Sequence, residues 1–100
     1  MIKNNNKQKW INPYTDSLLK VILKLKNLNE AHKFFRDLFT EKEILEFGQR
    51  WRVAKMLNNN VPYTKIEKET CMSSTTIARI HKWLKKGMGG YKLMIKKLKN

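Results

Sequence analysis

Cysteine, acidic residues and long apolar runs are scarce in this 100-residue chain, and each scarcity excludes a class of protein. The single cysteine, Cys71, rules out an internal disulfide and is typical of a reducing cytosol. No apolar run approaches the roughly 18 residues of a membrane span, because lysines interrupt residues 18–28. The first eight residues are mostly polar, so we expect no signal peptide. The expected location is the cytoplasm, away from any membrane.

The sequence also lacks combinations of residues that could form a metal site or a catalytic site. His32 and His81 have no companions at metal-ligand spacing, and Cys71 has no second thiol, so we expect no zinc or other metal. No nucleophile, base and acid occur together, and Gly89-Gly90 is too short for a phosphate-binding loop. We therefore expect neither an enzyme nor a cofactor.

The scarcity of acids is greatest in the last third of the chain. The chain has 22 Lys and Arg against 8 Asp and Glu, a net charge of +14, and residues 73–100 hold eight basic residues and no acidic one. Such a block attracts a polyanion, because neutralised phosphates release their counterions. Nucleic acid is the polyanion we favour, and the nucleoid is then the expected site. A lysine-rich composition is also what an AT-rich genome produces without selection for binding. A membrane surface is a weaker alternative, through the amphipathic stretch 91–99.

Apolar residues recur with the period of helices, and no alternating run indicates a strand. Residues 1–10 are polar and basic, which predicts a disordered tail before a single helical domain at residues 11–100. Asn12-Pro13 begins the first helix, and residues 27–29 end it, with Asn29 placed to cap the second.

A third helix is predicted to begin at a capping box formed by Thr40 and Glu43 and to run to about Leu57. It is apolar on two sides, which is typical of the centre of a bundle or of a subunit interface. Three shorter helices follow it, so the sequence predicts an all-α fold.

Residues 63–86 carry the motif on which the functional hypothesis depends. They read as a short helix ending near Thr70, a tight turn, and a second helix capped by Ser73. The two helices of a helix-turn-helix cross over a small interface, which needs apolar residues at a few fixed positions. Such residues are present at Ile66, Met72, Ile77 and Ile80. One departure is Cys71, which stands where the turn usually has glycine and where the backbone is left-handed.

The first turn of the second helix is small and polar, which suits entry into the major groove of DNA. We predict that Ser74, Thr75 and Thr76 read base edges. Contacts to phosphates are predicted for a further set, namely Thr64, Lys65, Ser73, Arg79, Lys82 and Lys85. The plainer alternative is that these residues only cap one of two small core helices.

At these residues the sequence resembles the tryptophan-repressor superfamily, most closely the branch of small Trp-repressor-like proteins called YerC/YecD. One part of the resemblance opens the third helix, and the other covers the turn and the second helix of the motif. The matching residues are Leu38, Thr40, Glu43, Arg50 and Val53, followed by Ile66, Glu69, Thr70, Ser73, Thr76, Ile77 and Arg79.

The resemblance implies six helices, an intertwined homodimer and a regulator of transcription, acting as a repressor, that binds double-stranded DNA. The family's prototype holds tryptophan between the third helix and the recognition helix, using arginines that match Arg50 and Arg79. Ile80 and Trp83 stand where that protein has glycine and serine, so both add bulk to the corresponding effector pocket. We therefore predict that tryptophan is not a corepressor here.

Two other classes stay open on the sequence alone. The lysine-rich end is compatible with a non-specific accessory protein that binds nucleic acid or RNA, although the aromatic stacking set typical of RNA readers is missing. A protein-interaction module, such as an antitoxin or an adaptor, would keep the helix-turn-helix without using it.

Overall fold

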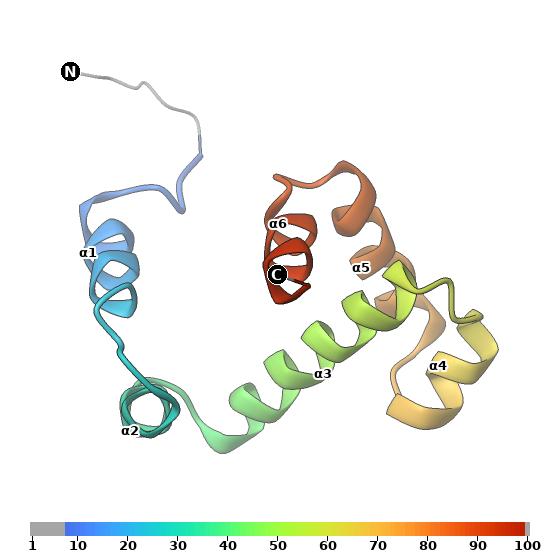
Figure 1. The fold of residues 1–100 in the computed structure, drawn as a ribbon, viewed down its shortest axis with the longest axis horizontal. Helices are drawn as coiled ribbons and strands as arrows, with labels where there is room; N and C mark the ends of the chain where they lie inside the picture. The colour runs from blue at the N-terminus through green and yellow to red at the C-terminus, as the bar shows by residue number, and fades with distance from the viewer. Residues whose placement is uncertain (1–7, 100) are drawn as a thin grey trace. The chain divides into compact units, whose positions relative to one another are not determined.

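The computed structural model describes residues 8–99, which contain six α-helices and no strand (Figure 1), so the predicted fold class is confirmed. The helices are α1 (Pro13–Ile22), α2 (Leu28–Leu38), α3 (Glu41–Asn58), α4 (Tyr63–Thr70), α5 (Ser74–Lys86) and α6 (Gly90–Leu98). The chain divides into two compact units, residues 1–39 and 40–100. Most of the predicted tail lies outside the described residues, and a hydrogen bond of 3.2 Å from Ile11 N–H to Gln8 O closes a turn at its end.

The first unit contains α1 and α2, and side-chain caps fix where each begins. Asn12 caps α1 as predicted, because its Oδ1 accepts the N–H groups of Tyr14 and Thr15. The prediction that Asn29 caps α2 is wrong. Asn27 is the cap, and its Oδ1 accepts the N–H of Glu30 at 2.9 Å.

The position of the second cap follows from a reciprocal pair of hydrogen bonds. The Glu30 carboxylate accepts the backbone N–H of Lys26 at 3.0 Å, while Asn27 accepts the N–H of Glu30. This arrangement satisfies donors on both sides of the helix start, as a capping box does. A cap at Asn29 would leave Glu30 unable to make either bond, and α1 correspondingly ends early, at Ile22.

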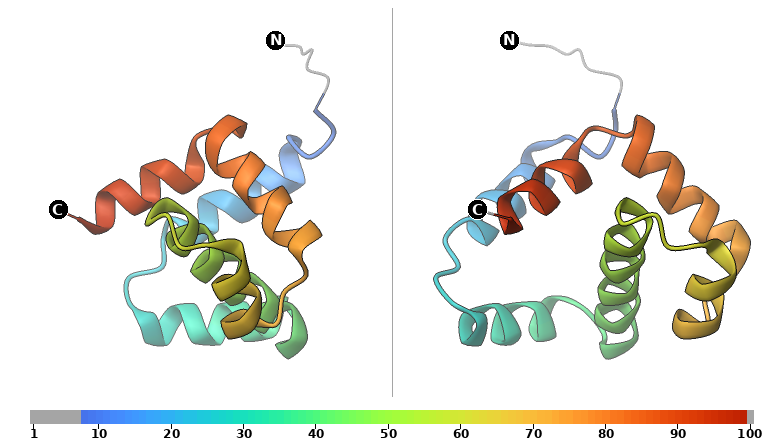
Figure 2. Two further views of the ribbon diagram at one scale, coloured as in Figure 1. Left: turned by 90° about the vertical axis from the view of Figure 1, so that its right-hand side faces the viewer. Right: turned by 45° about the vertical axis from the view of Figure 1, so that its right-hand side comes forward.

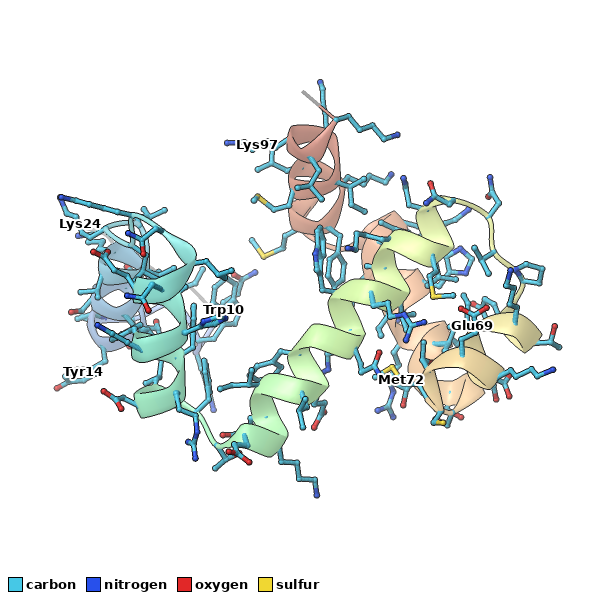
Figure 3. The ribbon with its side chains drawn as sticks, turned by 60° about the horizontal axis from the view of Figure 1, so that its bottom comes forward. Trp10, Tyr14, Lys24, Glu69, Met72 and Lys97 are labelled. Atoms are coloured by element: carbon cyan, nitrogen blue, oxygen red, sulfur yellow. The ribbon has the colours of Figure 1, made fainter. Side chains whose placement is uncertain are left out.

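The first unit has amphipathic helices but no buried residue in either of them. Leu23 is 82% exposed and Leu28 is 71% exposed. Tyr14 projects away from α1 (Figure 3) and is also largely exposed. These apolar groups therefore find no core within their own unit, although burial of a leucine side chain is worth about 1.5–3 kcal/mol.

The second unit contains α3 to α6 and a true hydrophobic core. The core consists of Val53, Ala54, Leu57, Ile66, Ile77, Ile80, Leu84 and Ile95. Helix α5 contacts α3, α4 and α6, and so it is the element that joins the unit (Figure 2). The capping box at Thr40 and Glu43 is confirmed. Only the C-terminal half of α3 enters the core, whereas Leu45 and Phe47 in its first half are exposed.

Candidate nucleic-acid interface

Helices α4 and α5 form a helix-turn-helix unit because the chain between them is closed tightly. Cys71 adopts the left-handed conformation that the sequence predicts, with φ of 61°, and its N–H donates to the Glu67 carbonyl. The Thr70 side chain is buried, donates to the Ile66 carbonyl at 2.7 Å and accepts the N–H of Met72 at 3.3 Å. The turn is therefore closed by the hydroxyl of Thr70 and by the left-handed backbone of Cys71.

The packing of α4 against α5 uses the predicted apolar positions. Ile66, Ile77 and Ile80 are fully buried, and Met72 packs against the same core from the turn (Figure 3). A hydrogen bond that sequence reasoning missed also joins α4 to α5, because Tyr63 Oη and His81 Nδ1 are 2.7 Å apart. These contacts hold α5 rigidly from one side.

The first turn of α5 is held in shape by Ser73. Its Oγ accepts the N–H of Thr76 at 3.2 Å and donates to Thr76 Oγ1 at 3.0 Å. The side chains of Ser74 and Thr75 are exposed, while Thr76 is partly covered. The hydroxyl of Ser73 is thus engaged in capping, and the exposed tip of α5 belongs to Ser74 and Thr75.

The predicted phosphate-binding residues lie on the exposed surface of the same two helices. Arg79, Lys82 and Lys85 are exposed along α5, and no acidic residue occurs in its first turn. Thr64 and Lys65 are exposed on α4. Their surface is cationic, and the N-terminal end of α5 adds the partial positive charge of its unpaired amides.

One acidic side chain partly neutralises this surface and also links α4 to α3. Glu69 lies 3.8 Å from the Lys65 ammonium and 3.4 Å from the Arg52 guanidinium of α3. Arg52 also donates to the Glu69 backbone carbonyl at 3.4 Å, at the C-terminal end of α4. Such exposed pairs contribute little stability, about 0–1 kcal/mol each. The Arg52 contacts join α3 to α4, whereas the Lys65 pair lies within α4.

The residues of the predicted effector pocket do not gather around one cavity. Ile80 is fully buried in the core, and the Arg50 guanidinium pairs with Glu46 at 3.1 Å and lies over Phe47. Trp83 is 45% exposed and lines an open apolar hollow of about 570 Å³. Trp51, Tyr91 and Met94 also line this hollow, but neither arginine does.

Metal binding and membrane insertion find no support in the described part of the chain. Residues 8–99 contain no group of three or more histidine, cysteine or acidic side chains that could hold an ion. None of the helices in this range combines the length and the apolar character that crossing a bilayer requires.

The fold and this interface define an all-helical protein with a helix-turn-helix at residues 63–86. The family model described as Trp repressor protein matches residues 14–99, and the chain therefore belongs to the Trp repressor family. The family places it among helix-turn-helix DNA-binding regulators.

Related proteins agree with this assignment over nearly the whole chain. The uncharacterized protein YerC of Bacillus subtilis is 42% identical over 84 residues, which are 84% of this chain and 81% of that protein. A crystal structure of a TrpR-like protein from Eubacterium eligens has a TM-score of 0.87 at 39% identity and covers 95% of both chains. A proposed Trp repressor from Staphylococcus aureus has a TM-score of 0.85 at 35% identity and covers 91% of both.

Proposed function

We propose that this protein is a homodimeric transcription regulator that binds specific sequences of double-stranded DNA and acts as a repressor. The observation that carries the proposal is the asymmetry of α5. One side of this helix is fully buried through Ile77 and Ile80, while Ser74 and Thr75 at its tip are exposed and uncharged. A rigid helix with a small polar tip fits the major groove, where base edges can be read. This activity would place the protein in the cytoplasm, at the nucleoid.

The roles within the interface follow from position and chemistry. Ser74, Thr75 and Thr76 read base edges from the first turn of α5. The phosphate contacts come from the exposed groups that surround this turn, namely Thr64, Lys65, Arg79, Lys82 and Lys85, together with the backbone N–H of Ser73, whose hydroxyl is used by the cap. Because phosphate contacts set orientation and base contacts set preference, the two sets have separable effects on binding.

The dimer is supported by apolar surface that the single chain leaves exposed. The helices of the first unit have no buried residue, and in the second unit Leu45, Phe47 and Trp83 are exposed. An intertwined second copy would cover such faces and would bring two α5 helices to one duplex. Two-fold symmetry then requires a pseudo-palindromic operator with half-sites about 34–36 Å apart.

Tryptophan is not a corepressor in this proposal. Ile80 occupies the core where the resemblance requires a glycine, and Arg50 is engaged by Glu46. Calorimetry tests this point directly, because a clear heat of L-tryptophan binding in the micromolar range would contradict it.

The proposed DNA-binding function is tested by selecting duplexes from a random library with the wild-type protein. A palindromic consensus is expected. Thr75→Ala should then relax the preference at one position of each half-site, whereas Ser17→Ala, an exposed serine on α1, should leave the consensus unchanged. Lys82→Ala should weaken all sequences alike and lower the slope of log affinity against log salt by about 0.9 for each phosphate released. If the selection enriches no duplex sequence, and structured RNA competes for the protein as well as duplex DNA does, the result would instead support a non-specific accessory protein.

A further inference from the structure

A second pocket lies behind the DNA-facing surface, between the α3–α4 turn, α5 and α6. It is open and has a volume of about 620 Å³, within the range of sites that hold small ligands. Leu57, Val61 and Leu84 supply apolar side chains to its wall. Leu57 and Leu84 are also part of the core, so this wall belongs to the rigid part of the second unit.

The polar side of the pocket consists of hydrogen-bond donors and cations. Lys85 comes from α5 and Lys92 from α6, so two cationic residues from different helices line the pocket. Asn58 and Asn60 add side-chain amides from the end of α3 and the turn after it. No carboxylate occurs among the described lining residues, which excludes a hard cation as the ligand and favours an anion.

The fifth polar group is an imidazole whose orientation is fixed. His81 lines the pocket, and its Nδ1 is joined to Tyr63 Oη at 2.7 Å, so Nε2 is the ring nitrogen left for a ligand. When Tyr63 donates to Nδ1, the neutral ring carries its proton on Nε2 and donates from there. An anion in the pocket selects this tautomer.

We propose that this pocket binds a small phosphate monoester. The phosphoryl group is a compact dianion with three strong acceptor oxygens, which suits the two lysines and the imidazole that line the pocket. The amides of Asn58 and Asn60 suit the hydroxyls of a polar body, and the apolar wall suits its carbon atoms.

The pocket also offers a way to regulate the DNA-binding surface, and this part of the inference rests on the proposed function. Lys85 and His81 line both the pocket and a shallow cationic depression on the outer face of α5, beside Lys82 and Lys86. Lys85 lies about 16 Å along the axis of α5 from Ser74. At this distance it can only just contact the backbone of the DNA groove that the tip of α5 enters. A bound phosphate ester and a DNA phosphate therefore compete for one ammonium group.

Binding is tested on the DNA-free protein by following its amide resonances during titration with glucose 6-phosphate and, separately, with inorganic phosphate. Shifts are expected at Asn58, Asn60 and Lys92. Lys92→Gln should weaken binding by about tenfold or more, as expected for one charge-assisted hydrogen bond. Lys97→Gln makes the same change on the same helix (Figure 3) at an exposed residue that does not line the pocket, and it should bind as the wild type does.

Several outcomes would overturn the assignment. Resonance shifts confined to the first turn of α5 would place the anion there instead. Equal weakening of binding by Lys92→Gln and Lys97→Gln would show that binding depends only on net charge. Glucose is the neutral control ligand and succinate is the dicarboxylate control ligand. Tight binding of either one would contradict a site for a phosphoryl group. Absence of shifts with millimolar glucose 6-phosphate would end the proposal.

The DNA arm separates failure of this inference from failure of the proposed function. Saturating glucose 6-phosphate should lower DNA affinity, and it should reduce the slope of log affinity against log salt by about 0.9 for each Lys85 that releases a DNA phosphate. In Lys92→Gln, whose change lies outside the proposed DNA-contact set, both effects should need about tenfold or more higher glucose 6-phosphate. If wild-type protein binds no DNA but shows the expected shifts, the regulator is refuted and the pocket stands.

Discussion

Replacing Cys71 with glycine should stabilise the protein, because the turn of the helix-turn-helix forces this residue into the left-handed region. Its φ is 61°, its side chain is exposed, and its N–H bond to Glu67 does not depend on the side chain. A non-glycine residue in this conformation costs about 1–2 kcal/mol. Removing this strain is a gain in stability, but the greater freedom of glycine in the unfolded chain subtracts about 0.5–1 kcal/mol from it. The net increase in the free energy of unfolding therefore lies between about 0 and 1.5 kcal/mol, with its centre near about 0.75 kcal/mol.

The assay is thermal or denaturant unfolding under reducing conditions at one fixed chain concentration, because self-association makes Tm depend on concentration. For a domain of this size a gain at the centre of this range corresponds to a rise in Tm of about 3–6 °C. Cys71→Ala is the matched control, because it removes the thiol and keeps the strain, so it should give no increase. Asn60→Gly tests the second left-handed position, with φ of 60°, where a smaller gain is expected because asparagine tolerates that region.

The decisive comparison is between the glycine and alanine variants at position 71. If both have the same Tm, the effect comes from loss of the thiol, and the strain inferred from the turn does not exist. If Cys71→Gly is stabilised but binds DNA more weakly, the turn depends on a stiff residue to hold the α5 tip in place.

Four further predictions concern stability and assembly. Ile77→Ala should lower the free energy of unfolding, measured by urea titration, by about 2–5 kcal/mol, because it leaves a cavity at a fully buried position of α5. Ser73→Ala should lower it by about 1 kcal/mol through loss of the α5 cap, and Ser74→Ala, one residue on, by much less; equal losses would contradict the cap assignment. Arg52→Ala should change it by under about 1 kcal/mol, because its pair with α4 is exposed. Leu28→Glu should convert a dimer into monomers in sedimentation equilibrium, and an unchanged mass would show that this apolar face is not at the subunit interface.

Much of the interface could be predicted because its signals are local. The cap at Ser73, the apolar residues Ile77 and Ile80, and the left-handed Cys71 each depend on neighbours within one or two helical turns. The roles of the exposed residues on α4 and α5 stay predictions, because no bound DNA tests them. The choice of Asn27 over Asn29 as a cap was missed because both asparagines suit the position, and only the reciprocal bonds of Glu30 distinguish them.

The sequence by itself determined that this chain is all-helical and where its helix-turn-helix lies, because helical period and capping act over three or four residues. Tertiary structure alone decided which distant groups meet. Tyr63 and His81 are 18 residues apart, and Lys85 and Lys92 come from separate helices, so their meeting depends on how α5 crosses its neighbours. The same is true of the unburied faces of α1 and α2, because an apolar stripe in a sequence does not say whether its partner is the same chain or another.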